Sequence, residues 1–354
     1  TFCDDSAPLL AYTDIRGAVT VWQLGKEHAG IEEDLPEFTK LPSALPACLL
    51  RVQFDEISQG HRISALAMSS NASYLGVGMT EPSLHIFRLK QEGTEKKRKL
   101  KLYKVTISDF KPRGVITKIV FSKCCKRAVV IESHTIVHVI DLETKHLATS
   151  WHHHRPQHSH FTQNVSPLVG QGDFIEAPIC AVAISDDSKF LTTADHNNIV
   201  NVFNLEQFKW VGALPRLYSP INTMWFAPNS NNLYIQVYPR SLIIAPISLQ
   251  QGKLHLEKIS DPLRVPTTKT ANIGGMSFDP EGDKMIFHTQ ADILIADTGA
   301  KHLKEKTSWS KLASFQTLLD ASFVGKGRVL VFERPWMKQL HHLPPPVKST
   351  AYGL

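Results

Sequence analysis

The sequence lacks long apolar runs, ordered cysteine pairs and the common catalytic motifs. No hydrophobic stretch approaches the roughly 18 residues that a membrane helix needs, so the sequence predicts no membrane partner. The five cysteines form neither a disulfide ladder nor paired Cys-x-x-Cys motifs, which is typical of a reducing compartment, the cytosol or the nucleus. A Gly-x-Ser-x-Gly elbow, a Walker loop and a carboxylate pair at informative spacing are also absent. We therefore expect no enzyme activity, no catalytic residue, no cofactor and no small-molecule substrate.

What the sequence does contain is a six-residue alternating strand that recurs along the chain at intervals of 42 to 65 residues. The copies are VTVWQL (19–24), LHIFRL (84–89), VHVIDL (137–142), VNVFNL (200–205), LIIAPI (242–247) and ILIADT (293–298). From the second copy onward, an apolar strand such as ICAVAIS (179–185), a polar turn and a short buried strand precede it. Such a unit, repeated, predicts the blades of a β-propeller.

The two ends of the chain extend the count to seven blades. TFCDDSAPLLAYTD (1–14) aligns without a gap on SFDPEGDKMIFHTQ (277–290), and LLDASFV (318–324) followed by RVLVFE (328–333) begins a further unit. The sequence therefore predicts an all-β fold, a seven-bladed WD40-type β-propeller over residues 1–343, followed by a proline-rich tail, 344–354. The repeats are degenerate, because no blade carries the full Gly-His and Trp-Asp set. We expect an incomplete innermost strand in the first blade, and a chain that is part of a longer protein.

The alignment of the repeats also places five residues at the same position of the innermost strands. Alternation in a strand directs every second side chain to one face, so these residues should pack between blades and be buried. They are Leu66, Ile119, Val182, Met224 and Met276.

Positive charge is concentrated in one segment, residues 88–127. It holds 14 Lys and Arg against three acids, a net charge of +11, whereas the whole chain carries +6. Such a local field attracts a polyanion, and release of counterions from phosphates would supply binding energy. The candidate RNA-binding residues are Lys96, Lys97, Arg98, Lys99, Lys101, Lys104, Lys111, Arg113, Lys123, Lys126 and Arg127. The alternative is a solvated loop that serves only solubility.

A histidine-rich insertion, residues 152–174, lies between the third and fourth blades. Its imidazoles are those of His152, His153, His154, His158 and His160. Several imidazoles in one loop are able to bind a transition metal, but no cysteine or carboxylate stands at ligand spacing. We therefore expect a flexible, exposed insertion and no metal site.

The end of the sequence, VFERPWMKQLHHLPPPVKSTAYG (331–353), resembles the carboxyl terminus of the cirhin family. The Glu333-Arg334-Pro335 triplet and the LPPPVK stretch (343–348) carry the resemblance, and APNSNNL (227–233) and the opening through VTVWQL are also similar. The resemblance covers essentially the whole chain, as the second propeller of a tandem-propeller protein. The family has a lysine-rich stretch after the triple proline, where this chain has only Lys348. The basic segment is therefore a better RNA-binding candidate than the tail.

The resemblance implies a non-catalytic scaffold of the nucleus and nucleolus. Its implied place is the UTP-A (t-UTP) subcomplex of the small-subunit processome. There it would bind the 5′ external transcribed spacer of pre-rRNA and other UTP-A proteins during pre-rRNA processing and early 40S ribosome biogenesis. The alternative is a general protein-interaction propeller adaptor in a multi-subunit complex, without RNA contact. Steep salt dependence of binding would indicate RNA rather than a peptide.

Overall fold

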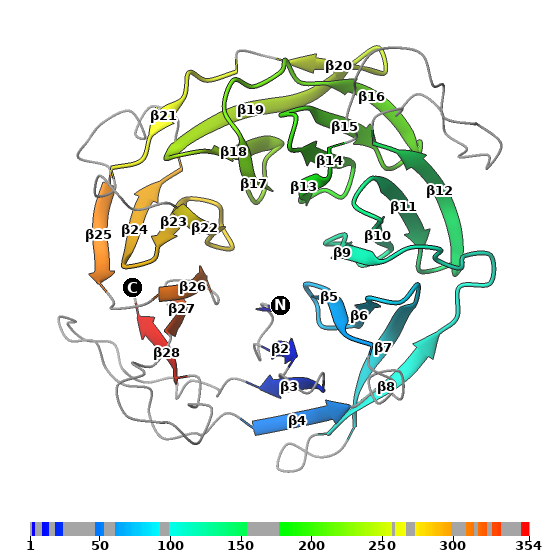
Figure 1. Cartoon of the computed structure of the whole chain (residues 1–354). Coiled ribbons are helices and arrows are strands. Elements are labelled where there is room, and N and C mark those ends of the chain that lie inside the picture. The colour runs from blue at the N-terminus through cyan, green and yellow to red at the C-terminus, as the bar shows by residue number, and fades with distance from the viewer. Residues whose placement is uncertain are drawn as a thin grey trace. The chain divides into compact units, whose positions relative to one another are not determined.

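In a computed structural model, the described part of the chain consists of β-strands and the turns that join them, without a helix (Figure 1). The structure describes residues 2–3, 9–13, 18–23, 47–52, 61–92, 99–153, 177–256, 259–266, 273–298, 309–314, 318–323, 328–333 and 348–353. These strands form seven antiparallel sheets, distributed over two compact units.

The first unit contains four sheets of four strands, and in each sheet the strand order follows the chain. The first sheet has β1 (Phe2–Cys3), β2 (Leu9–Thr13), β3 (Val19–Gln23) and β4 (Ala47–Val52). The second has β5 (Ile63–Met68), β6 (Tyr74–Met79), β7 (Leu84–Glu92) and β8 (Lys99–Val105). The third has β9 (Ile116–Phe121), β10 (Arg127–Glu132), β11 (Ile136–Asp141) and β12 (His146–His152). The fourth has β13 (Ile179–Ile184), β14 (Phe190–Asp195), β15 (Val200–Asn204) and β16 (Lys209–Ala213).

The other three sheets begin at Ile221 and belong to the second unit, except for residues 249–254 of the fifth sheet, which belong to the first. The fifth has β17 (Ile221–Phe226), β18 (Asn232–Val237), β19 (Ser241–Gln250) and β20 (Lys253–Leu256), with β21 (Leu263–Arg264) paired to β19. The sixth has β22 (Ile273–Phe278), β23 (Lys284–Thr289), β24 (Asp292–Asp297) and β25 (Trp309–Ser314). The seventh has β26 (Leu318–Phe323), β27 (Arg328–Glu333) and β28 (Lys348–Gly353).

Two expectations about the ends of the chain have different outcomes. The innermost strand of the first sheet, β1, has only two residues, as expected. The proline-rich tail, by contrast, does not stand apart from the propeller, because residues 348–353 form β28 and pair along the whole of β27. The three prolines before residue 348 predict an irregular tail, and a segment as short as 348–353 gives only a weak strand signal in the sequence.

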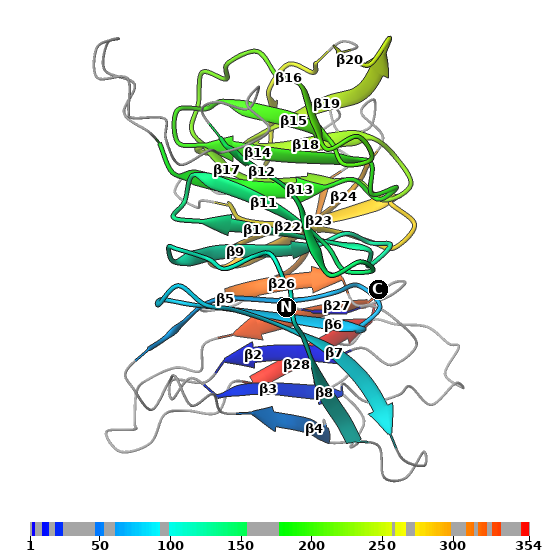
Figure 2. The same ribbon diagram turned by 90° about the vertical axis from the view of Figure 1, so that its right-hand side faces the viewer.

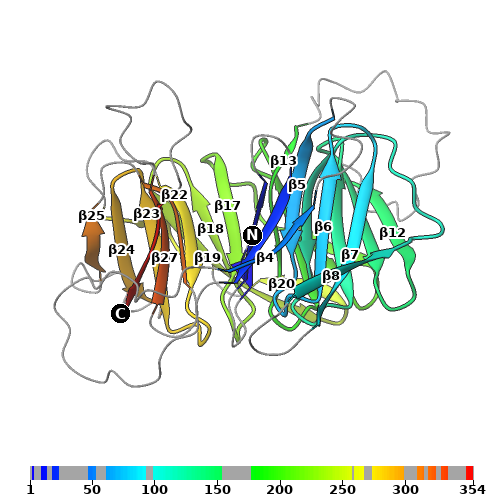
Figure 3. The same ribbon diagram turned by 90° about the horizontal axis from the view of Figure 1, so that it is seen from below.

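Hydrophobic clusters lie between consecutive sheets within each unit. The one between the first and second sheets contains Leu9, Val21, Leu75 and Leu89, and another joins the fifth and sixth through Tyr234 and Phe287. The middle strands are therefore covered on both faces, and all six residues of β14 are buried. Figure 2 shows β9, β10 and β11 side by side, and Figure 3 shows the same for β5, β6 and β7.

The five equivalent inner-strand residues confirm the strand register. Each pairs with a central residue of the next strand, as Val182 does with Thr193 and Met276 with Phe287. Three of the five are buried: Ile119, Met224 and Met276. The expectation of burial is wrong for Leu66 and Val182, which are only partly buried although they pack against their clusters.

Candidate nucleic-acid interface

The outer hairpin of the second sheet carries the basic segment on one of its faces. Its second strand, β8, reads KLKLYKV, an alternation of basic or aromatic residues with leucine. Leu100 and Leu102 pack with Leu89 of β7 into the cluster against the first sheet. Side chains alternate between the faces of a strand, so the residues between these leucines lie on the opposite face.

This opposite face, the hairpin face, consists of Arg88, Lys90 and Glu92 of β7 with Lys101 and Tyr103 of β8. The register pairs Arg88 with Tyr103 and Lys90 with Lys101. Arg88, Lys90, Lys101 and Tyr103 are all exposed. Three cations and one carboxylate give the described side chains of this face a net charge of +2. Lys99, in register with Glu92, belongs to the same face, but its side chain is outside the described residues.

Glu92 links the two residues of β8 that share its face. The Lys101 Nζ lies 2.5 Å from Oε2 of Glu92, and the Tyr103 hydroxyl donates to Oε1 at 3.1 Å. These contacts lower the pKa of the Glu92 carboxyl, so it stays ionised at neutral pH. The Lys90 Nζ lies 5.2 Å from the centre of the Tyr103 ring, within cation–π range. Glu92 therefore forms an ion pair with Lys101 and attracts Lys90 from a longer distance. Among the described residues, Arg88 and Lys90 form no ion pair within 4.0 Å.

Two further predicted residues, Lys111 and Arg113, lie on the connector from β8 to β9. Both are exposed, and within the described chain neither side chain forms an ion pair. The connector runs along the third sheet, because Asp109 Oδ1 accepts from the backbone of Leu147 at 2.8 Å. Just before β9, the connector is held by Glu132 of β10. The Oε1 of Glu132 accepts from the backbone nitrogens of Arg113 at 2.8 Å and Gly114 at 2.6 Å.

Glu132 is the anchor of this connector. It is buried at the end of β10, where the Nε2 of His138 lies 2.8 Å from its Oε2. Burial raises the pKa of Glu132, but the hydrogen bonds from His138 and from the backbone of Arg113 and Gly114 outweigh it and lower the pKa. The carboxylate form is therefore favoured, and its stabilising contribution is lost only as the pH falls through the lowered value. This anchor holds Arg113 at the end of β10.

Gly114 lies at a crowded position beside the anchor. A Cβ at this position would overlap the Ser133 Oγ and lie 3.3 Å from Oε1 of Glu132. We expect Gly114→Ala to lower the free energy of unfolding by about 1–3 kcal/mol through overpacking. Urea denaturation checks this value, and the same substitution in a Ser133→Ala background, which lacks the overlapping hydroxyl, tests whether crowding is responsible. An unchanged Gly114→Ala stability would show that the Ser133 hydroxyl rotates away at no cost and that space at Gly114 is not limiting.

Three other predicted residues form a separate group at the turn between β9 and β10. Lys123 Nζ lies 2.6 Å from Asp186, and Lys126 Nζ lies 3.2 Å from Glu143. Arg127 lies over the ring of Phe208, at 5.2 Å. Arg113 lies near the end of β10 and Lys126 just before its start, so roughly 20 Å of strand separates them. The sequence-predicted residues therefore do not form one patch, and this group is largely compensated.

The rest of the predicted segment falls into three cases. Lys104 is exposed on the face of β8 opposite to the hairpin face, paired with Phe87. Lys99 belongs to β8, but its side chain, like all of Lys96, Lys97 and Arg98, lies outside the described residues. Lys118, one of the segment's cations, is partly buried and donates to the backbone oxygen of Cys180, and burial lowers the pKa of its amine.

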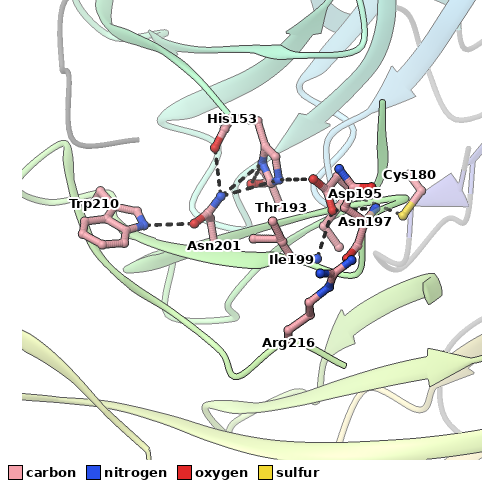
Figure 4. A network of polar contacts seen from close by, with 10 residues as sticks. His153, Cys180, Thr193, Asp195, Asn197, Ile199, Asn201, Trp210 and Arg216 are labelled. Carbon is pink, nitrogen blue, oxygen red and sulfur yellow. Dashed lines mark hydrogen bonds and ion pairs between the residues drawn. The ribbon is translucent and has the colours of Figure 1, made fainter. Parts of the chain in front are cut away.

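The histidine insertion begins differently from the prediction. His152 ends β12 and His153 follows it, and both are buried rather than exposed. His153 belongs to a polar network in the fourth sheet, in which its Nδ1 lies 2.9 Å from the Thr193 Oγ1 and its Nε2 lies 3.5 Å from Asp195 (Figure 4). The other three histidines, 154, 158 and 160, lie outside the described residues.

The same network also organises the turn after β14. Asp195 Oδ1 accepts from the backbone nitrogens of Asn197 at 3.0 Å and Ile199 at 2.9 Å. Asn201 donates to the backbone oxygen of His153 at 3.0 Å and accepts from the Trp210 indole at 3.1 Å (Figure 4). These contacts join the end of β12 to β14, β15 and β16, so the network holds the sheet together.

Sequence reasoning did not identify Glu132, His138, Asp195 or Asn201. The available signal was that a carboxylate ends the second strand in both RAVVIE (127–132) and FLTTAD (190–195). A polar residue, His138 or Asn201, then follows at the corresponding position of the next strand.

The described residues contain no group of three or more His, Cys, Asp or Glu side chains that would hold a metal ion. They also contain no helix long and apolar enough to cross a membrane.

Comparison with known proteins supports the fold. No family model and no curated protein sequence matches the chain. Among solved structures, the chain is similar to the β-propeller domain of Cps50 (Swd1) from Myceliophteria thermophila, with a TM-score of 0.56 and 11% identity, over 94% of this chain and 93% of that one. The chain therefore has an all-β β-propeller fold, as its repeats predict.

Proposed function

We propose that this propeller is a non-catalytic scaffold subunit of the small-subunit processome. In this role it binds the 5′ external transcribed spacer of pre-rRNA and other UTP-A proteins in the nucleolus, during early 40S ribosome biogenesis. The propeller fold supports the scaffold part of the proposal, because such folds commonly present interaction surfaces rather than catalytic groups. The cirhin-like ending supports the assignment to the processome.

One observation carries the RNA-binding part of the proposal. Arg88, Lys90, Lys104, Lys111 and Arg113 are exposed on neighbouring elements, and no described carboxylate forms an ion pair with them. Uncompensated cations are the groups that gain most from phosphate contacts, because they give up no existing ion pair. Such contacts position RNA without reading its sequence.

The test is a salt titration of the purified chain with a fluorescent single-stranded RNA from the 5′ external transcribed spacer. Four to five phosphate contacts predict a slope of about −3 for log affinity against log salt concentration. RNA cross-linking followed by peptide mapping should place the contacts within 88–127. No binding at low salt, or cross-links confined to other sheets, would contradict the proposal and favour the adaptor without RNA contact.

A further inference from the structure

The hairpin face combines exposed cations with an exposed aromatic ring. Three large hydrophobic side chains are exposed in the described chain, and all are tyrosines: Tyr103, Tyr218 and Tyr238. Of these, only Tyr103, which is 43% exposed, belongs to the basic segment. Arg88 is its direct cross-strand neighbour, and Lys90 lies over its ring.

The ring is also oriented by its neighbours. The hydroxyl donates to Glu92, and Glu92 is held in turn by Lys101. Leu100 and Leu102, on either side of Lys101, anchor β8 from its other face. A ring that is already oriented loses little conformational freedom when a ligand stacks on it.

We propose that Tyr103 is a stacking site for an unpaired nucleobase, with Arg88, Lys90 and Lys101 contacting the flanking phosphates. This inference rests on the proposed function and specifies its ligand as single-stranded RNA. Aromatic rings flanked by cations bind single strands without sequence preference, because every base has a π-face. A base-paired duplex keeps its bases within the helix and cannot stack on an exposed side chain in this way.

The experiment compares Tyr103→Ala with the parent chain, using a 12-nucleotide oligouridine as the probe. Alanine should weaken binding roughly 5- to 150-fold, the loss expected for one stacked base. The salt slope should stay unchanged, because no phosphate contact is removed. Tyr103→Phe should lose much less affinity than alanine, since it keeps the ring that stacks and gives up only the hydroxyl that orients it.

Two controls make the result specific. Tyr218→Ala removes a fully exposed tyrosine elsewhere in the first unit and should leave binding unchanged. Thermal unfolding of each variant checks that the fold is intact, and a 12-base-pair RNA duplex should bind the parent and Tyr103→Ala equally.

The outcomes separate this inference from the proposed function. If the parent binds oligouridine with a steep salt slope and Tyr103→Ala binds equally well, stacking at Tyr103 is wrong while the proposed function stands. If the variant instead loses salt dependence, or loses duplex affinity by the same factor, the ring only positions cations and the inference is also wrong. If the parent binds no RNA at all, both fail.

Discussion

Reversing the charge of five cations in the β8 region is expected to weaken RNA binding by about a hundredfold or more at 0.1 M salt, because phosphate contacts dominate such affinity. The variant replaces with glutamate the five exposed cations that form no ion pair among the described residues: Arg88, Lys90, Lys104, Lys111 and Arg113. For each phosphate of a single strand that the variant no longer neutralises, the salt slope should also fall by about 0.7. The strands should remain folded, because surface substitutions usually shift stability by about half a kcal/mol each.

The matched control reverses five exposed lysines outside the basic segment. Both variants change the net charge of the chain from +6 to −4, so any effect of total charge is the same. The control residues are Lys145, Lys189, Lys209, Lys253 and Lys284. We expect the control to lose far less affinity and to keep its salt slope. Equal losses in both variants would mean that only the total charge matters, and that the basic segment is a solvated surface.

Asp195→Ala is expected to lower the free energy of unfolding by about 1–3 kcal/mol, the cost of leaving buried hydrogen-bond donors without their acceptor. Asp195 is fully buried, and its removal would leave the backbone nitrogens of Asn197 and Ile199 without their acceptor. His153, also fully buried, would no longer have the carboxylate 3.5 Å from its Nε2. Urea denaturation followed by tryptophan fluorescence measures the change.

Two comparisons test the cause of this destabilisation. Asp297→Ala removes an exposed carboxylate for which no partner is found in the described chain, and should shift stability by no more than about 0.5 kcal/mol. Asp195→Asn should cost less than alanine, because the amide oxygen still accepts from the turn. An alanine variant as stable as the Asp297→Ala control would show that the network of Figure 4 does not hold the fourth sheet.

The alternation of the strands was readable from the sequence because it is local. The inner-strand positions of Ile119, Met224 and Met276 followed from aligned repeats, and the structure buries all three. The strand in the tail, β28, could not be predicted from the sequence, because it depends on a contact that is not local. Its prolines are a strong local signal, whereas the pairing of β28 with β27 depends on a strand earlier in the chain.

The sequence does not show which of the cations form ion pairs with carboxylates. Lys123 and Lys126 look equivalent to Lys111 in the sequence, but folding brings Asp186 from the next sheet to Lys123 and Glu143 to Lys126. His153 likewise looks like one member of an exposed histidine run, yet Thr193 and Asp195 of β14 enclose it.

The sequence by itself determined the class of fold, the register of the inner strands and the location of the positive charge. Each of these depends on residues a few positions apart, through the alternation of side chains along a strand. Only the tertiary structure decided which cations remain uncompensated, which histidines are buried, and that Tyr103 shares a face with Arg88 and Lys90. These properties depend on which strands lie side by side, and that pairing joins residues that are distant along the chain.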